Sequence, residues 1–145
     1  MTNAIAGHAV ALHIGNGSTA ETFSAIAEVL DISGPNQTVE QIEVTSHSSA
    51  GWREFIAGLR DGGEISFPVN FIPGDTTQWG TGNDSLMDLF NTGTTWNYRI
   101  VFPNGYYGEF AALITAFGVS APVDGAVTAD MAMKISGAVT WDQTT

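Results

Sequence analysis

Large apolar side chains recur at every second position in several stretches of this chain. In residues 64–71 the apolar positions are Ile65, Phe67, Val69 and Phe71, and the positions between them are polar or proline. The same period of two recurs in residues 8–14, 94–102 and 126–140. Because successive side chains of a β-strand point to opposite faces of its sheet, this period predicts strands with one buried face. The chain is therefore expected to be mainly β.

Glycine separates the alternating stretches and supports the same conclusion. The 145-residue sequence contains 17 glycines, above the average of roughly 7%, and most of them lie where turns are needed. Pro103-Asn104-Gly105 joins residues 94–102 to residues 106–119 in a long hairpin. Pro68 lacks a backbone donor, so its strand is expected at a sheet edge or at a bulge.

Two earlier segments are predicted as strands with less regular patterns. Residues 23–32 carry apolar side chains on both faces and end at Ser33-Gly34-Pro35, where the proline removes a ladder donor. Residues 39–45 form a short strand in which Val39 and Ile42 depart from simple alternation, and this departure indicates a bulge.

One helix is predicted, from Asp84 to Phe90, capped by Asn83 or Asp84 and ending near Gly93. In residues 46–63, spacings of three and four predict one face of a short helical turn, formed by Trp52, Phe55, Ile56 and Leu59. The glycines around this turn argue against a long helix. Residues 1–145 are interpreted as a single domain.

The charge balance excludes two classes of partner. Fifteen Asp and Glu residues against four Lys and Arg residues give a formal net charge of −11. Phosphate neutralisation needs clustered cations, so nucleic-acid binding by this mode is excluded, and an acidic surface also repels an anionic membrane. Charged residues make up 13% of the chain, about half of the typical ~25%. So few charges indicate that much of the surface contacts other subunits. Without an evident secretory signal, we expect synthesis in a cytoplasm.

Catalytic and metal sites find little support in the sequence. The chain has no cysteine, which excludes disulfides and thiolate ligands. His8 and His13 are five residues apart, on opposite faces of a strand. His47 lies in the cluster Thr45–Ser49, where a nucleophile could stand beside a base, yet without an oxyanion-hole motif a hydrogen-bonded loop is favoured. Residues 74–84 have a calcium-like composition without the required acid spacing, so a turn-rich loop is favoured. We expect no catalytic residue, metal or cofactor.

Three segments carry a resemblance to a known family. They are Ser33-Gly34-Pro35, the run from Ile42 to His47 and the run from Arg53 to Glu64. Their order and spacing resemble the lambda-like tail tube family of siphophages. The similarity continues through residues 65–73, 86–93, 99–103 and 135–140, and it covers nearly the whole chain. The combination is fairly specific, unlike any single piece of it.

The resemblance implies a fold and an assembly. The family's fold is a β-sandwich or partial barrel with one flanking helix, and its subunits form stacked hexameric rings whose long hairpins join into one β-barrel around a DNA-conducting channel. We expect the intersubunit strands to include Ile65, Phe67, Val69, Phe71, Trp96, Tyr98 and Ile100. Some relatives carry an additional immunoglobulin-like domain, which we do not expect here.

The resemblance also implies a location and partners. We expect a structural protein of the virion tail, assembled in the host cytoplasm, and not an enzyme. Its main partner is itself. A tape measure protein is expected in the lumen, with tail terminator and baseplate proteins at the ends. DNA is expected to pass through without specific binding, because an acidic wall repels phosphate.

Residues 45–63 are expected to dock one ring onto the next. Their large apolar side chains are unusual for a solvated loop, and they contain half of the chain's Lys and Arg residues. In the family, the long excursion between early strands makes contacts between rings. The residues expected to dock are Thr45, His47, Trp52, Arg53, Phe55, Ile56, Leu59 and Arg60. The alternative is that the aromatic side chains fold back onto their own core.

Other classes of function stay open. Trp52, Trp79, Trp96 and Trp141 could form a sugar-stacking platform, so a carbohydrate-binding β-sandwich module is one alternative. A tube or ring protein of a related contractile or tail-terminator machine is another, because it would share the same assembly physics. An esterase-like enzyme centred on His47 is a distant third.

Overall fold

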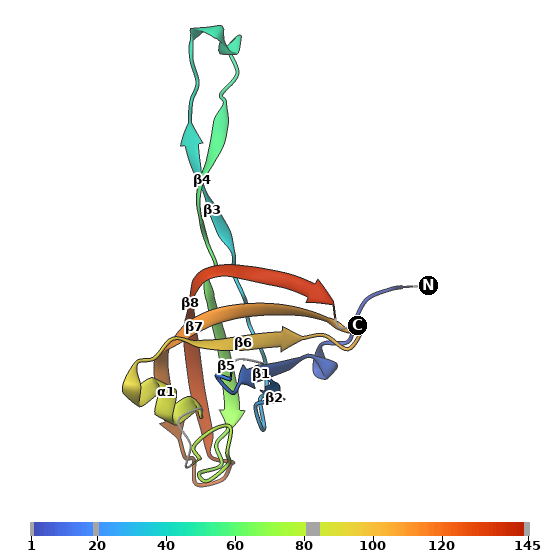
Figure 1. Cartoon of the computed structure of the whole chain (residues 1–145), viewed down its shortest axis with the longest axis vertical. Helices are drawn as coiled ribbons and strands as arrows, with labels where there is room; N and C mark the ends of the chain where they lie inside the picture. Colours follow the sequence, from blue (N-terminus) through green and yellow to red (C-terminus); the bar gives the residue numbers. More distant parts are fainter. Residues whose placement is uncertain (1, 19–20, 81–84, 144–145) are drawn as a thin grey trace.

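The body of the molecule is one antiparallel sheet wrapped around a single core, and a two-stranded hairpin projects from it (Figure 1). The computed structural model describes residues 2–18, 21–80 and 85–143. Strand order in the six-stranded sheet is β2-β1-β6-β7-β8-β5, and β3 pairs with β4 in the hairpin. The strands are β1 (Ala11–Gly15), β2 (Phe23–Ala25), β3 (Thr38–Glu43), β4 (Phe55–Asp61), β5 (Glu64–Asn70), β6 (Trp96–Val101), β7 (Tyr106–Ser120) and β8 (Thr128–Gln143). Helical segments are η1 (Gly7–Ala9), η2 (His47–Ser49) and α1 (Leu86–Thr92).

The two longest strands, β7 and β8, bend the sheet over its own core. Their pairing shifts register between Glu109 and Ala111 and again between Ile114 and Ala116. Such bulges bend a strand pair and increase its twist. The sheet therefore folds into a sandwich-like shape that is not closed into a barrel (Figure 1). All the strands except β2, β3 and β4 contribute buried side chains to its core. The predicted mainly β class with one flanking α-helix is confirmed, as is the hairpin of β6 and β7.

Strand β5 ends the sheet, as Pro68 predicted, but its outer side is covered. The segment 28–33 runs beside it, where Leu30 N donates to Pro68 O at 2.9 Å and Ser33 N donates to Ser66 O at 2.9 Å. The predicted strand over residues 23–32 is therefore wrong: only Phe23–Ala25 forms a strand, and it pairs with β1. The chain turns at Glu28 (φ 58°), because residues 23–25 pair with β1 near one edge of the sheet and residues 29–33 run beside β5 at the other edge.

Helix α1 packs against β7 through Leu86 and Leu89, both buried. The helix and its end at Gly93, which adopts a left-handed conformation (φ 67°), are confirmed. Its N-cap is Ser85, whose hydroxyl donates to the Asp88 carboxylate at 2.6 Å. The predicted caps Asn83 and Asp84 lie outside the described residues.

Residues 55–61 form strand β4 instead of the predicted helical turn. Cross-strand pairing with β3 satisfies the backbone groups of this segment, whereas a short isolated helix containing Gly58 would be marginal in water. The short strand predicted over residues 39–45 and its bulge are confirmed, since the register of β3 and β4 shifts between Val39 and Gln41.

Candidate functional site

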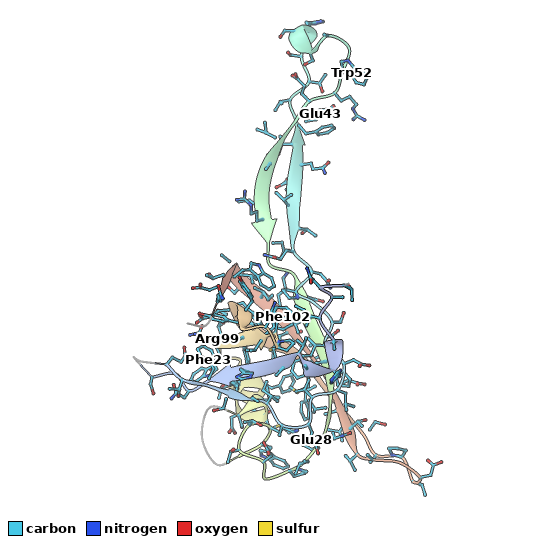
Figure 2. The ribbon with its side chains drawn as sticks, turned by 90° about the vertical axis from the view of Figure 1, so that its right-hand side faces the viewer. Phe23, Glu28, Glu43, Trp52, Arg99 and Phe102 are labelled. Atoms are coloured by element: carbon cyan, nitrogen blue, oxygen red, sulfur yellow. The ribbon has the colours of Figure 1, made fainter. Side chains whose placement is uncertain are left out.

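The β3–β4 hairpin carries large apolar side chains that do not pack onto the core of the subunit. Figure 2 shows Trp52 at the far end of this hairpin, well away from Phe102 and Arg99 in the body. Trp52 is 78% exposed and Leu59 is 82% exposed, and Phe55 and Ile56 are about half exposed. Large apolar side chains exposed together on one projection are typical of surfaces that contact other proteins. The alternative that these side chains fold back onto their own core does not fit the structure.

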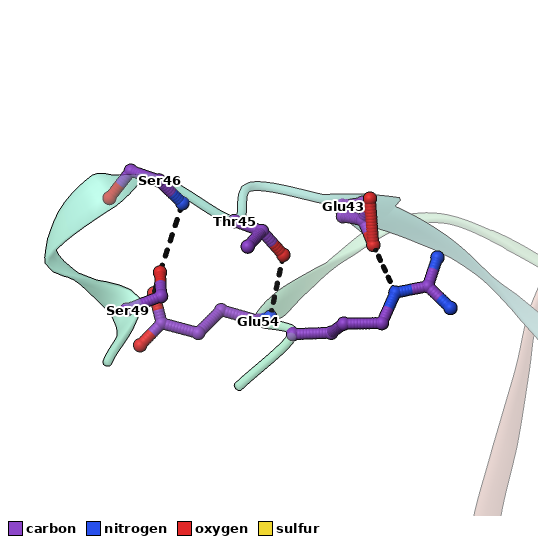
Figure 3. A network of polar contacts seen from close by, with 6 residues as sticks. Glu43, Thr45, Ser46, Ser49 and Glu54 are labelled. Carbon is purple, nitrogen blue, oxygen red and sulfur yellow. Dashed lines mark hydrogen bonds and ion pairs between the residues drawn. The ribbon is translucent and has the colours of Figure 1, made fainter. Parts of the chain in front are cut away.

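A network of hydrogen bonds closes the tip of the hairpin (Figure 3). Ser46 N donates to Ser49 Oγ at 2.9 Å, and Ser49 Oγ donates to the Glu54 carboxylate at 2.7 Å. Glu54 N in turn donates to Thr45 Oγ1 at 2.9 Å. Ser49 is buried although it lies far from the core. The tip thus has a defined shape within the isolated subunit, and an ordered surface of this kind pays a lower entropy cost if it binds.

His47 begins the 3-10 turn η2 at the tip and is exposed. The hydrogen-bonded loop predicted around it is confirmed, because the serine hydroxyls bond to one another and to Glu54. Within the described part of the chain, no hydrogen bond joins His47 to a serine hydroxyl. The described residues also contain no group of three His, Asp or Glu side chains that could hold a metal ion.

The two arginines of the hairpin differ in their surroundings. Arg53 Nε donates to the Glu43 carboxylate at 2.7 Å, and the Arg53 guanidinium lies 5.5 Å from the centre of the Phe55 ring. The Arg53 side chain is nevertheless 74% exposed, so its remaining donors face solvent. Arg60 lies at the base of the hairpin and is exposed, and among the residues described no acidic side chain pairs with it.

The residues predicted for intersubunit strands lie inside the subunit. Five of the seven are buried in the core, and Phe71 and Trp96 pack against it. The buried five are Ile65, Phe67, Val69, Tyr98 and Ile100. Strand β6 pairs with β1 and β7 on its two sides, so it has no free edge. The apolar alternation marks the face of a strand that packs on its own core, and it carries no information about which strand edge is open.

Several stretches of the sheet lack a pairing strand on one side among the described residues, and two of them lie at β2 and at the end of β8. Over the described residues, no strand pairs with the outer side of β2. The second half of β8, residues 136–143, pairs with β7 on one side only, because β5 ends its pairing with β8 at Glu64 and Lys134. These edges were not predicted from the sequence, since pairing partners are set by the tertiary fold.

The remaining candidates have structural roles. His13 lies opposite Arg99 in the sheet, and burial, together with the nearby guanidinium, lowers the pKa of His13 below its usual value. Asp75 accepts hydrogen bonds from Thr77, and the one from the hydroxyl lowers the pKa of Asp75. The turn-rich loop is confirmed over residues 74–80, and residues 81–84 lie outside the described residues. Gln78, which sequence reasoning missed, is buried and bonds the backbone of Ala27.

A family model described as "Lambda phage tail tube protein, TTP" matches residues 12–142. The chain belongs to this family. As a tail tube protein it is a structural component of the tail of a phage particle. The described residues contain no helix long and apolar enough to cross a membrane. A search of curated proteins finds no match.

Solved structures share the tail tube fold over almost the whole chain. The tail of an empty gene transfer agent particle, refined with C6 symmetry, contains a chain that is 23% identical, with a TM-score of 0.72 over 96% of this chain and 99% of that one. The SPP1 tail tube matches at 15% identity, with a TM-score of 0.71 over 97% of this chain and 80% of that one. A sheath/tube terminator of an extracellular contractile injection system matches at 13% identity, with a TM-score of 0.72 over 98% and 99%.

Proposed function

We propose that this tail tube protein assembles into hexameric rings, and that the rings stack into a tube around a channel that conducts DNA. The observation that carries the proposal is the β3–β4 hairpin, an ordered projection whose exposed side chains are apolar (Figure 2). The C6 symmetry of the gene transfer agent tail supports six subunits in a ring. Closed cyclic symmetry is also the usual solution for homo-oligomers.

The hairpin tip docks one ring onto the next. Trp52 and Arg53 belong to the residue types that dominate binding energy in protein interfaces. Both are exposed, and the hydrogen-bond network of the tip holds the chain around them in place. Thr45 and His47 lie in the same tip, and Phe55, Ile56, Leu59 and Arg60 continue the contact surface along β4.

Ring closure uses the open sides of β2 and of the end of β8. The outer side of β2 in one subunit pairs with residues 136–143 of β8 in its neighbour, so that the sheets of the ring form one continuous barrel. An unpaired edge exposes backbone N–H and C=O groups, and pairing in a closed ring satisfies them without open-ended aggregation. A barrel built from many strands leaves an open lumen.

DNA passes through this lumen without specific binding. The net charge of −11 repels phosphate. The cations of the body are neutralised within the subunit: the Arg99 guanidinium lies 4.0 Å from the centre of the Phe23 ring and 3.4 Å from the Glu109 carboxylate, and Lys134 pairs with Asp61 at 2.6 Å. A tape measure protein occupies the lumen during assembly, terminator and baseplate proteins cover the ends, and the chain has no enzymatic role.

Assembly of the purified protein tests this function. We expect sedimentation velocity over a range of concentrations to show rings and polymers, and negative-stain electron microscopy to show hollow tubes. A strictly monomeric protein at every salt and protein concentration would refute the proposal. The structural likeness to a tube terminator makes single rings the second candidate, and rings that never elongate would favour it.

A further inference from the structure

A groove opens where the hairpin leaves the body. The pairing of β5 with β8 ends at Glu64 and Lys134. Beyond this pair, the chain on the β5 side belongs to β4 and the hairpin, and β8 bends away from it. Gly137 adopts a left-handed conformation (φ 88°) at this bend. The groove between the two strands has a volume of about 800 Å³, and its apolar wall consists of Val39, Leu59, Ile135, Ala138 and Val139.

Arg60, which pairs with no acidic side chain among the described residues, lines this groove. The side chain of Arg60 borders it beside Leu59, which is 82% exposed. The other Lys and Arg side chains, Arg53, Arg99 and Lys134, each form an ion pair with a described acidic residue. The groove also carries Asp61, but its carboxylate pairs with Lys134. In a chain with 15 acidic residues, an arginine that pairs with no described acid beside an apolar groove wall indicates a partner that brings both an apolar side chain and a carboxylate.

The opposite end of the body carries a segment with this chemistry. The turn between β7 and β8, residues 121–127, lies at the end of the molecule away from the hairpin (Figure 1). Val123 at its apex is fully exposed (107%), and Val119 and Val127 beside it are also exposed. Asp124 follows Val123, is exposed, and has no hydrogen-bond or ion-pair partner among the described residues.

We propose that the turn of residues 121–125 in one subunit inserts into the groove between β4 and β8 of a second copy in the next ring. Val123 contacts Leu59 of the groove, and the Asp124 carboxylate pairs with the Arg60 guanidinium. The inference rests on the proposed stacking of rings and names a contact in addition to the hairpin tip. The groove volume is in the range of pockets that enclose a drug-sized ligand, which is about the bulk of a tight turn.

The positions of the two surfaces favour a second copy over any other occupant. The groove opens at the base of the hairpin and the turn projects from the other end of the body, to one side of the hairpin axis, so a shift along the long axis combined with a sideways displacement brings them together (Figures 1 and 2). Such a contact is heterologous, because different surfaces of the two copies meet. Heterologous contacts that do not close on themselves generate filaments.

Charge reversal tests the pairing of Arg60 with Asp124. We expect Arg60→Glu and Asp124→Arg each to raise the critical concentration for tube formation about tenfold or more, and the double variant to return within about threefold of the wild type. Both side chains are exposed, so the melting temperature of the monomer should not change. Asp130→Arg, a reversal at an exposed acid of β8 outside both surfaces, serves as the matched control and should polymerise normally.

Cross-linking tests the contact directly, since the chain has no native cysteine. Tubes assembled from a mixture of Leu59→Cys and Val123→Cys subunits are oxidised with copper phenanthroline. We expect covalent dimers joining positions 59 and 123, and no such dimers from either variant alone or from Leu59→Cys mixed with Asp130→Cys.

The outcomes separate this inference from the proposed function. If the wild type forms tubes but dimers between positions 59 and 123 are absent, the contact is refuted and ring stacking stands. If Arg60→Glu blocks elongation and Asp124→Arg does not restore it, the groove binds another segment and the inference is likewise overturned. If the wild type never forms tubes, the proposed function fails and takes the contact with it.

Discussion

Replacing Trp52 and Arg53 with alanine should separate assembly from folding. Both side chains lie at the tip of the hairpin, with Trp52 78% exposed and the Arg53 side chain 74% exposed, so the core loses nothing when they are truncated. Aromatic and arginine hot spots in interfaces contribute about 2 kcal/mol or more each, which is about a 30-fold change in an association constant. We therefore expect the double variant to raise the critical concentration for tubes at least about 30-fold.

The measurement combines circular dichroism melts with sedimentation and negative-stain micrographs. The double variant should melt like the wild type and remain a soluble monomer or ring. Trp79→Ala with Arg99→Ala is the matched control, because the same residue types are removed from the body. Trp79 stacks on Phe71 with ring centres 6.3 Å apart, and Arg99 lies between two aromatic rings, so this pair should lower the melting temperature instead. Normal tubes from the tip variant, or a large loss of its monomer stability, would refute the docking role.

Three further outcomes are expected. The wild type should show no binding to duplex or single-stranded DNA at ~150 mM salt, and a micromolar dissociation constant in a filter or anisotropy assay would contradict the role assigned to the charge. Thr77→Ala should raise the pKa of Asp75 towards its ordinary value, because the Thr77 hydroxyl is the main cause of its lowering; an unchanged carboxylate titration by NMR would show that the cause lies elsewhere. Gly93→Ala should destabilise the monomer by about 1 kcal/mol in a denaturant titration, since the left-handed conformation disfavours a side chain, and an unaltered midpoint would argue against this cap geometry.

The alternation of apolar residues predicted the strands that pack on the core. It succeeded for β5, β6 and β8 because each has one face on the core, so burial and the strand period coincide. The spacing of three and four, which predicted a helical turn, failed for residues 55–59, because the apolar side chains there are exposed and their spacing marks no buried face. The alternation also failed after Ala25, because it does not indicate that the chain leaves the side of β1 there and that Val29 pairs with Val69 of β5.

The candidate site could be predicted from the sequence only in part. The apolar side chains of residues 45–63 predicted a contact surface in this segment, since such side chains need a partner within the subunit or outside it. The groove beside Arg60 was beyond prediction, because it depends on where β4 and β8 separate. The same holds for the covered outer side of β5, which follows from the path of residues 28–33.

The hairpin projects from one end of the body only (Figure 1). A stack of such subunits, all in the same orientation, has polarity. One terminus presents the projecting β3–β4 hairpins with their apolar side chains, and the other presents the β7–β8 turns. Addition of new rings at the two termini then involves different binding events, with different rates. A protein that covers the first terminus must bind the projecting hairpins, and a protein that covers the other must bind the turns. The two caps of the tube cannot be interchangeable.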